Sequence, residues 1–181
     1  LSDADGIVRV RDATFEINAG EIVGIAAVEG SGQRELLRAL AGRLAPASGV
    51  LAHPSAVGFV PEDRHHDAVL PNRSLSENVA LRGAGARRGM MDWDAVGAQT
   101  ERLMLAYDVR AESAHVSIRT LSGGNQQKLV LARELEIGSD SERAIVVENP
   151  TRGLDVRATA EVHARLRRAA LDGAAIVLYS S

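Results

Sequence analysis

Residues Leu121–Glu136, with the sequence LSGGNQQKLVLARELE, decide the fold of this chain. Ser122 is a natural N-cap residue, because its hydroxyl can accept a backbone N–H from the first turn of a helix. Gly123 and Gly124 follow it, although each glycine costs a helix about 1 kcal/mol relative to alanine. We therefore expect a capped helix whose N-terminus is approached closely by another backbone or by a phosphate group. A simple capped helix is the alternative interpretation.

A second stretch, Ala144–Val156 (AIVVENPTRGLDV), follows downstream. It reads as an apolar strand that ends in the carboxylate of Glu148, and it resembles the strand that presents a Mg²⁺-orienting acid to a nucleotide. Alone the pattern is ambiguous, because many strands end in polar turns. The order of glycine loop, capped helix and acid-tipped strand is more informative than any one of the three.

The glycine loop is Val28–Glu35 (VEGSGQRE), which lies between a predicted strand and a predicted helix. Backbone N–H groups and the helix dipole can bind an anion there. A complete P-loop adds a lysine that reaches the phosphates and a hydroxyl that binds Mg²⁺. Gln33 and Arg34 stand at those two positions, and Ala27 replaces the first glycine. Taken alone, the stretch is better explained as a plain strand-to-helix turn.

The remaining pattern alternates apolar strands with helices. The predicted strands are Glu21–Val28, Val57–Val60, Arg143–Glu148 and Ala174–Tyr179, with a further segment rich in β-formers at Val8–Ile17. The predicted helices cover residues 33–41, 74–81, 92–107, 125–137 and 156–171. This alternation predicts an α/β fold with a mostly parallel sheet covered on both faces. Residues 63–117 contain helices but no convincing strand, so we expect an inserted helical lobe there.

Composition excludes several function classes. The net charge of −3 gives no reason to expect nucleic acid as a partner. Cysteine is absent, which excludes disulfides and thiolate metal sites. His65 and His66 lie beside acids, but no further ligands cluster with them. The chain opens on Leu1 and stops on Ser181 directly after an apolar run, so we expect a fragment of a longer cytoplasmic polypeptide.

Together these motifs resemble the nucleotide-binding domain of ABC transporters over nearly the whole chain. LSGGNQQK is close to the signature of that family, which is highly specific when an acid-tipped strand and a GLD segment follow. VEGSGQ, VPEDR (Val60–Arg64), LSGGNQQK and NPTRGLDV together are similar to the second ATPase domain of double-domain importers for simple sugars and nucleosides. The NPTRGLDV form favours the nucleoside branch.

The resemblance implies a P-loop NTPase fold with a short N-terminal β segment and an inserted helical lobe. The first part of the ATP-binding core would cover residues 1–62, the lobe residues 63–117, and the second part residues 118–181, cut short at the C-terminus. Residues of the nucleotide site would be Gly30, Ser31, Gly32, Gln33, Arg34, Glu35, Glu62, Ser122, Gly123, Gly124, Asn125 and Asp155.

The site on this domain's own P-loop departs from the family pattern at several positions. Gln33 cannot supply the cation, and Arg34 cannot coordinate Mg²⁺. Glu148 replaces the usual aspartate and is a weak candidate ligand for Mg²⁺. Asn149 stands at the position of the catalytic glutamate and cannot accept a proton from water.

Two more positions of this site also differ. Glu62 stands at the coupling glutamine, and Ser181 at the switch histidine. We expect that this site holds ATP and Mg²⁺ weakly or not at all, and that the isolated domain is inactive.

The signature side keeps the family pattern. Ser122, Gly123 and Gly124 would contact the γ-phosphate of ATP that the opposite domain holds. Asn125 replaces the usual glutamine but still offers an amide donor, and Asp155 keeps the GLD aspartate. We therefore expect an importer ATPase domain that completes the ATP site of its partner.

The resemblance also implies the partners and the location. They are a second ABC ATPase domain on the same polypeptide, transmembrane permease subunits and, indirectly, an extracytoplasmic solute-binding protein. The location would be the cytoplasmic face of the cell membrane, with Pro61–Asn78 facing the permease.

Two other classes remain as alternatives. One is a pseudo-ATPase interaction module that binds no nucleotide. The other is a non-transport ABC ATPase, against which the absence of long coiled-coil heptads and of a basic linker argues.

Overall fold

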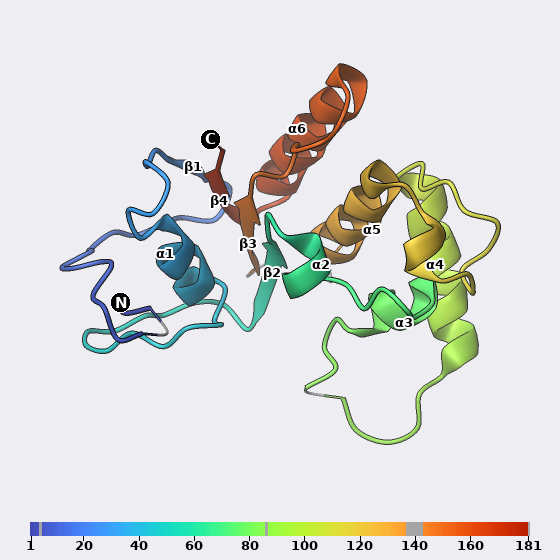
Figure 1. Ribbon diagram of the computed structural model, residues 1–181, viewed down its shortest axis with the longest axis horizontal. Coiled ribbons are helices and arrows are strands. Elements are labelled where there is room, and N and C mark those ends of the chain that lie inside the picture. Colours follow the sequence, from blue (N-terminus) through green and yellow to red (C-terminus); the bar gives the residue numbers. More distant parts are fainter. Residues whose placement is uncertain (4, 86, 137–142, 181) are drawn as a thin grey trace. The chain divides into compact units, whose positions relative to one another are not determined.

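The computed structural model describes residues 1–3, 5–85, 87–136 and 143–180 (Figure 1). The chain forms two compact units, one of residues 1–62 with 137–181 and the other of residues 63–136. Among the described residues, no helix combines the length and the apolar composition that a membrane crossing requires.

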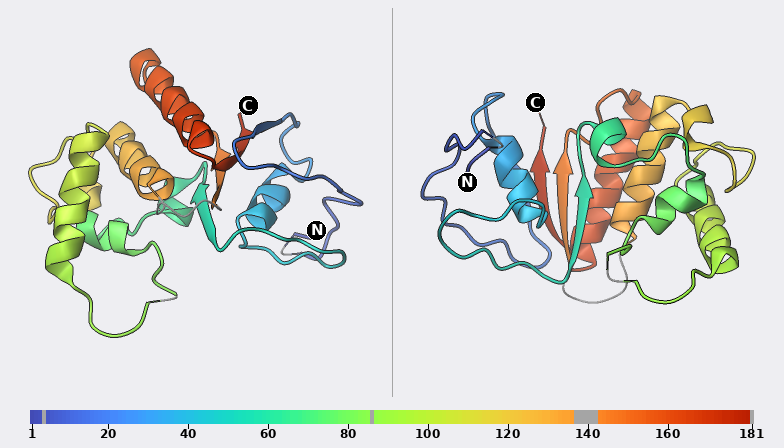
Figure 2. Two further views of the ribbon diagram at one scale, coloured as in Figure 1. Left: turned by 180° about the vertical axis from the view of Figure 1, so that it is seen from behind. Right: turned by 60° about the horizontal axis from the view of Figure 1, so that its bottom comes forward.

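The first unit is built on a four-stranded parallel sheet. Its strands are β1 (Ile22–Ile25), β2 (Ala56–Val60), β3 (Arg143–Glu148) and β4 (Ala175–Tyr179), in the order β1-β4-β3-β2. Figure 2 shows β4, β3 and β2 side by side in its right-hand view. The helices of this unit are α1 (Gln33–Leu40) and α6 (Val156–Leu171). The predicted α/β fold with a parallel sheet is confirmed.

Side chains alternate between the two faces along each strand, and the central strands β3 and β4 are largely buried on both faces. On one face, Leu37 of α1 packs in a core cluster with four sheet residues, Phe59, Val146, Val177 and Tyr179. The residues between them point to the other face and are also buried: Val60, Ile145, Val147 and Ile176. This two-sided burial explains why β3 reads as a continuous apolar run in the sequence.

The N-terminal part of the sheet differs from the sequence prediction. Residues 8–17 form no strand, and only an isolated antiparallel bridge joins Ser2 to Val8. Arg9, Arg11 and Asp12 interrupt this apolar pattern, and Asp12 has a positive φ of 48°. β1, predicted as buried, alternates between exposed and half-buried residues, because it is an edge strand that pairs only with β4 among the described residues.

The second unit is helical. Its elements are α2 (Arg64–Asp67), α3 (Leu75–Ala80), α4 (Trp93–Ala106), a 3-10 turn (Ile118–Thr120) and α5 (Gly123–Leu135). Two predicted caps are confirmed: Ser74 and Glu77 form a capping box on α3, and Asp92 caps α4. Helix α2 was not predicted. Asp63 starts this short helix by accepting a hydrogen bond from the backbone of His66.

A buried ion network holds α5 within the second unit. The Arg133 guanidinium donates to the carbonyls of Ala68 and Asn78, at 2.9 Å each, and to the carboxylate of Glu134 at 2.6 Å. Arg82 donates to the other oxygen of Glu134 at 2.5 Å. Helix α5 packs on α3 and α4, and this unit extends to residue 136, beyond the lobe boundary predicted at Ser117.

Candidate functional site

The C-terminal ends of the parallel strands bring most predicted residues of the first unit to one edge of the sheet. β1 leads into the glycine loop, β2 is followed by Glu62, and β3 ends at Glu148 and Asn149. In open parallel sheets, ligands bind at this edge. The topology therefore supports a binding site there, whatever its occupant.

Hydrogen bonds within the glycine loop fix its conformation. The hydroxyl of Ser31 donates to the carbonyl of Val28 at 2.6 Å. Gly30 and Gly32 have φ of 83° and 95°, in the left-handed region that favours glycine. A Cβ on Gly32 would lie 2.6 Å from the carbonyl oxygen of Arg9. Gly32 is thus required by a close approach of the chain's own N-terminal segment.

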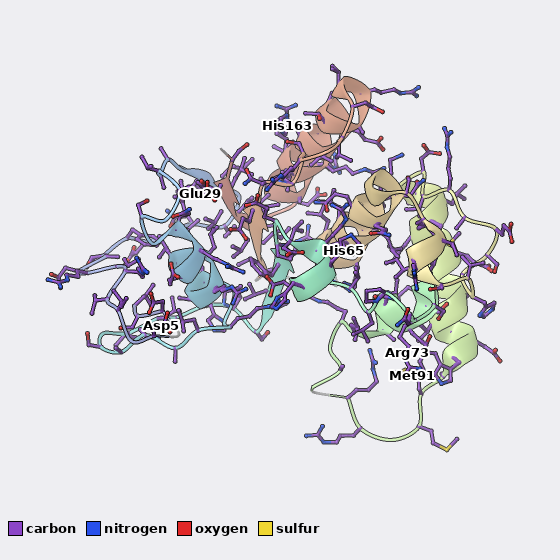
Figure 3. All side chains as sticks on the ribbon, in the orientation of Figure 1. Asp5, Glu29, His65, Arg73, Met91 and His163 are labelled. Atoms are coloured by element: carbon purple, nitrogen blue, oxygen red, sulfur yellow. The ribbon has the colours of Figure 1, made fainter. Side chains whose placement is uncertain are left out.

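Helix α1 begins directly after this loop without a side-chain cap. Gln33 is buried, and its Oε1 has no hydrogen-bond partner among the described residues. Arg34 is exposed, while Glu35 adds a negative charge to the first turn. Glu29 lies on the loop that leads into the helix (Figure 3). The backbone is suited to a phosphate, but the side chain at the lysine position is a neutral, buried amide.

The carboxylate of Glu62 is bonded to two other side chains of the chain. The amide Nδ2 of Asn149 donates to Glu62 Oε2 at 3.0 Å, and the guanidinium of Arg152 forms an ion pair with Glu62 Oε1. The backbone N–H of Glu62 donates to the carboxylate of Glu148 at 3.3 Å. The structure therefore brings together three predicted residues, Glu62, Glu148 and Asn149, and adds Arg152.

Arg152 was missed in the sequence analysis, although a signal existed. Glu62 places a carboxylate where the family has a neutral glutamine, and a positive partner stabilises such a charge. The arginine of NPTRGLDV, Arg152, can supply it. Asn149 has a φ of 44°, which asparagine tolerates better than most residues, and its N–H donates to the carbonyl of Tyr179 at 2.8 Å. The backbone at position 149 thus suits asparagine better than glutamate.

The donor set does not fit a magnesium ion. Position 34 offers no hydroxyl, and Glu62 already accepts from Asn149 and Arg152. Within the part of the chain that the structure describes, no group of three histidine or carboxylate side chains could hold a metal ion, and this includes His65 and His66. Glu148 stays a candidate magnesium ligand, as predicted from the sequence.

The signature end of α5 lies in the second unit. Ser122 caps the helix as predicted: its Oγ accepts from the backbone N–H of Asn125 at 3.4 Å and from the Asn125 side-chain amide at 3.1 Å. Since the oxygen serves as acceptor in both bonds, its proton is available to a further acceptor. Ser122 and Gly123 are exposed. The exposed end therefore offers a hydroxyl donor and backbone N–H groups.

Gln126 joins the N-terminal end of α5 to the segment that precedes it. It is buried, and its side-chain amide donates to the carbonyls of Ile118 and Leu121, at 3.1 Å each. The Nε of Arg64 donates to Gln126 Oε1 at 3.4 Å. Both residues were missed in the sequence analysis, and the bond between them joins segments that are 62 positions apart.

Two other predicted residues stand apart from these groups. Asp155 caps α6 by accepting from the backbone of Ala158 at 2.8 Å, which gives it a structural role in this unit. Ser181, predicted at the position of the switch histidine, lies outside the described residues.

Known proteins similar to this chain include several import ATP-binding proteins. The nucleoside import ATP-binding protein NupA of Lactococcus lactis subsp. cremoris is 35% identical over 99% of this chain and 38% of its own length. The guanosine import ATP-binding protein NupO of Bacillus subtilis is 33% identical over the same shares. The ribose import ATP-binding protein RbsA 2 of Streptomyces avermitilis is 35% identical over 94% of this chain and 36% of its own length. The chain thus spans well under half the length of these relatives.

Solved structures support the fold. The ATP-binding cassette MJ0796, in a dimeric structure bound to ADP and Pi, has a TM-score of 0.78 at 22% identity, over 95% of this chain and 79% of that one. The ATP-binding subunit of another ABC transporter has a TM-score of 0.76 at 19% identity, over 99% of this chain and 75% of that one. A family model described as ABC transporter matches residues 10–140. Sheet, loop, signature helix and family match together show that the chain belongs to the ABC transporter family.

Proposed function

We propose that this chain is an ATP-binding domain of an ABC importer for sugars or nucleosides. Its signature end would complete the ATP site on the P-loop of a partner ABC domain, while its own P-loop site does not hydrolyse ATP. The similarity to import ATP-binding proteins for nucleosides, guanosine and ribose supports the substrate class. Because the chain spans 38% of the first of these relatives, the partner domain would lie in the same polypeptide.

The observation that carries this proposal is the bonding of Asn149. Its amide donates to Glu62, so the position of the general base holds a group that cannot accept a proton from water. Loss of a general base commonly lowers a rate by about 10² to 10⁴. Ser122, by contrast, has the geometry of an intact N-cap with a free hydroxyl proton.

This assignment also implies partners. We infer that permease subunits receive the helical segment around residues 61–78, that a solute-binding protein acts with them outside the membrane, and that the chain works at the cytoplasmic membrane face.

The test compares two substitutions in the full-length protein, assembled with its permease. Ser122→Arg places a bulky side chain at the signature end and should abolish ATP turnover, whereas Asn149→Ala should leave turnover unchanged. The isolated chain should show no ATPase activity above background. Normal turnover of the Ser122→Arg protein, or activity of the isolated chain that Asn149→Ala removes, would contradict the proposal.

A second candidate is an interaction module that binds no nucleotide at its own site. The neutral, buried Gln33 and the pairing of Glu62 with Arg152 favour it for the first unit. Equilibrium dialysis of the isolated chain with ATP tests this candidate, since binding of ATP at millimolar nucleotide would exclude it.

A further inference from the structure

Arg64 lies directly against the first signature glycine. A Cβ built on Gly123 would be 2.6 Å from Nη2 of Arg64, so the guanidinium fills the space that any side chain at position 123 would need. The Nε of the same arginine donates to Gln126, one turn further along α5. Figure 1 shows α2, which carries Arg64, beside one end of α5, and Figure 3 labels its neighbour His65.

The charge of this guanidinium is not neutralised by a carboxylate. Among the described residues, no acid forms an ion pair with Arg64. Its two acidic neighbours are engaged elsewhere: Asp63 accepts from the backbone of His66, and Asp67 contacts the His66 ring at 3.0 Å. The first turn of α5 also contains no acidic residue. Within the part of the chain that the structure describes, a positive charge is therefore held next to exposed Ser122 and Gly123 without an ion-pair partner.

A guanidinium in this place is suited to a phosphate group. Arginine presents a planar set of N–H donors that matches phosphate oxygens and can bind them in pairs. The free proton of Ser122 and the N-terminal N–H groups of α5 offer further donors of the same kind.

We propose that Arg64 binds the terminal phosphate of the nucleoside triphosphate that the partner ABC domain holds. It would thus supply, from the second unit, a cation for the shared site. This inference rests on the proposed function, because it requires that the signature end meets the partner's ATP. Arg64 would then distinguish triphosphate from diphosphate, because a diphosphate lacks the terminal phosphate that Arg64 is proposed to bind.

The alternative is that Arg64 only packs over Gly123 and supports Gln126. Arg64→Met separates the two roles, because methionine keeps much of the volume above Gly123 but has no charge. Arg64→Lys keeps the charge and loses the paired donors. Arg102→Met is the matched control, since Arg102 is an exposed arginine of α4 in the same unit.

The experiment measures ATP turnover of the full-length protein with its permease in proteoliposomes. For Arg64→Met, the KM for ATP should rise by about tenfold to a hundredfold, the range expected for loss of a charged hydrogen bond. The inhibition constant of ADP should stay unchanged, Arg64→Lys should show a smaller rise, and Arg102→Met none.

Two results would overturn the assignment of Arg64. One is an unchanged KM for ATP in Arg64→Met, and the other is an equal weakening of ATP and ADP, as a packing role predicts. If Ser122→Arg also leaves turnover normal, the proposed function itself fails. If Ser122→Arg abolishes turnover while Arg64→Met is normal, only the role of Arg64 fails.

Discussion

Helices α1 and α5 both begin beside glycines, yet their first turns differ in every polar group. α1 follows Gly32 in a left-handed conformation, has no side-chain cap, and carries Glu35 in its first turn. α5 is capped by Ser122, has no acid in its first turn, and lies against the guanidinium of Arg64. The glycines also serve different purposes, because the chain's own backbone crowds Gly32 while a flexible side-chain tip crowds Gly123.

This difference shows that glycine spacing alone does not identify a working phosphate site. In the unit of α1, Gly30 and Gly32 of the loop are kept, but Glu62 is bonded to Asn149 and Arg152. The buried Oε1 of Gln33 has no partner among the described residues. At the start of α5, Ser122 and Gly123 are exposed, and the Ser122 hydroxyl acts as an acceptor in both of its described bonds. The contrast supports the proposal that the two helix starts differ in function, and the following substitutions test it.

The largest effect is expected at the other end of α5, from Arg133→Met. Arg133 is buried, and its removal leaves the carbonyls of Ala68 and Asn78 without this donor and changes the pairing of Glu134. Breaking a buried ion pair costs about 3–5 kcal/mol. Urea denaturation of the isolated chain should show a loss in this range. Exposed Arg102→Met serves as the control, and a loss below about 1 kcal/mol for Arg133→Met would mean that α5 is not held by this network.

The next effect separates the two glycines. Gly32→Ala should lower the free energy of unfolding by at least about 2 kcal/mol, because a left-handed φ is unfavourable for alanine and its Cβ would clash with the Arg9 carbonyl. Gly123→Ala should change it by less than about 1 kcal/mol, since only the tip of Arg64 must move and alanine favours the helix. Equal losses in thermal or urea unfolding would remove the distinction between the two helix starts.

A smaller effect on the free energy of unfolding is expected from Glu62→Gln. The side chain of Arg152 is 74% exposed, so its ion pair with Glu62 is screened by solvent and is worth less than about 1 kcal/mol. The isolated chain should gain no ATPase activity, because Asn149 still lacks a basic oxygen. A colorimetric phosphate assay checks this, with Glu161→Gln on the surface of α6 as the control. Measurable turnover in Glu62→Gln would show that this pair, rather than Asn149, blocks the site.

The smallest effect on stability is expected at a third helix start, the N-cap Ser74 of α3. The backbone N–H of Ser74, followed by its side chain, holds the pKa of Glu77 below the usual range. A lowered pKa in the folded state stabilises the protein above the unfolded pKa of about 4.3, and this contribution is lost as the pH falls through the folded value. Glu77→Gln should therefore lose slightly more stability at neutral pH than in acid. A difference between the two proteins that grows on acidification would contradict this sign.

Local features of the fold could be predicted because their physical causes lie within a few residues. The caps at Ser74, Asp92 and Ser122 depend on hydrogen bonds that span three positions. The apolar run of β3 likewise predicted a strand buried on both faces. The short helix α2 was missed because its four residues carry no apolar period.

The amino-acid sequence by itself determined the α/β class, the helix caps and the family, since these follow from periodicity and from motifs of contiguous residues. Only the tertiary structure decided which distant residues meet. It joined α5 to the helical unit, paired Glu62 with Arg152, and laid Arg64 against Gly123. Contacts across some 60 to 90 positions are not set by the preferences of neighbouring residues, because they depend on how the whole chain packs.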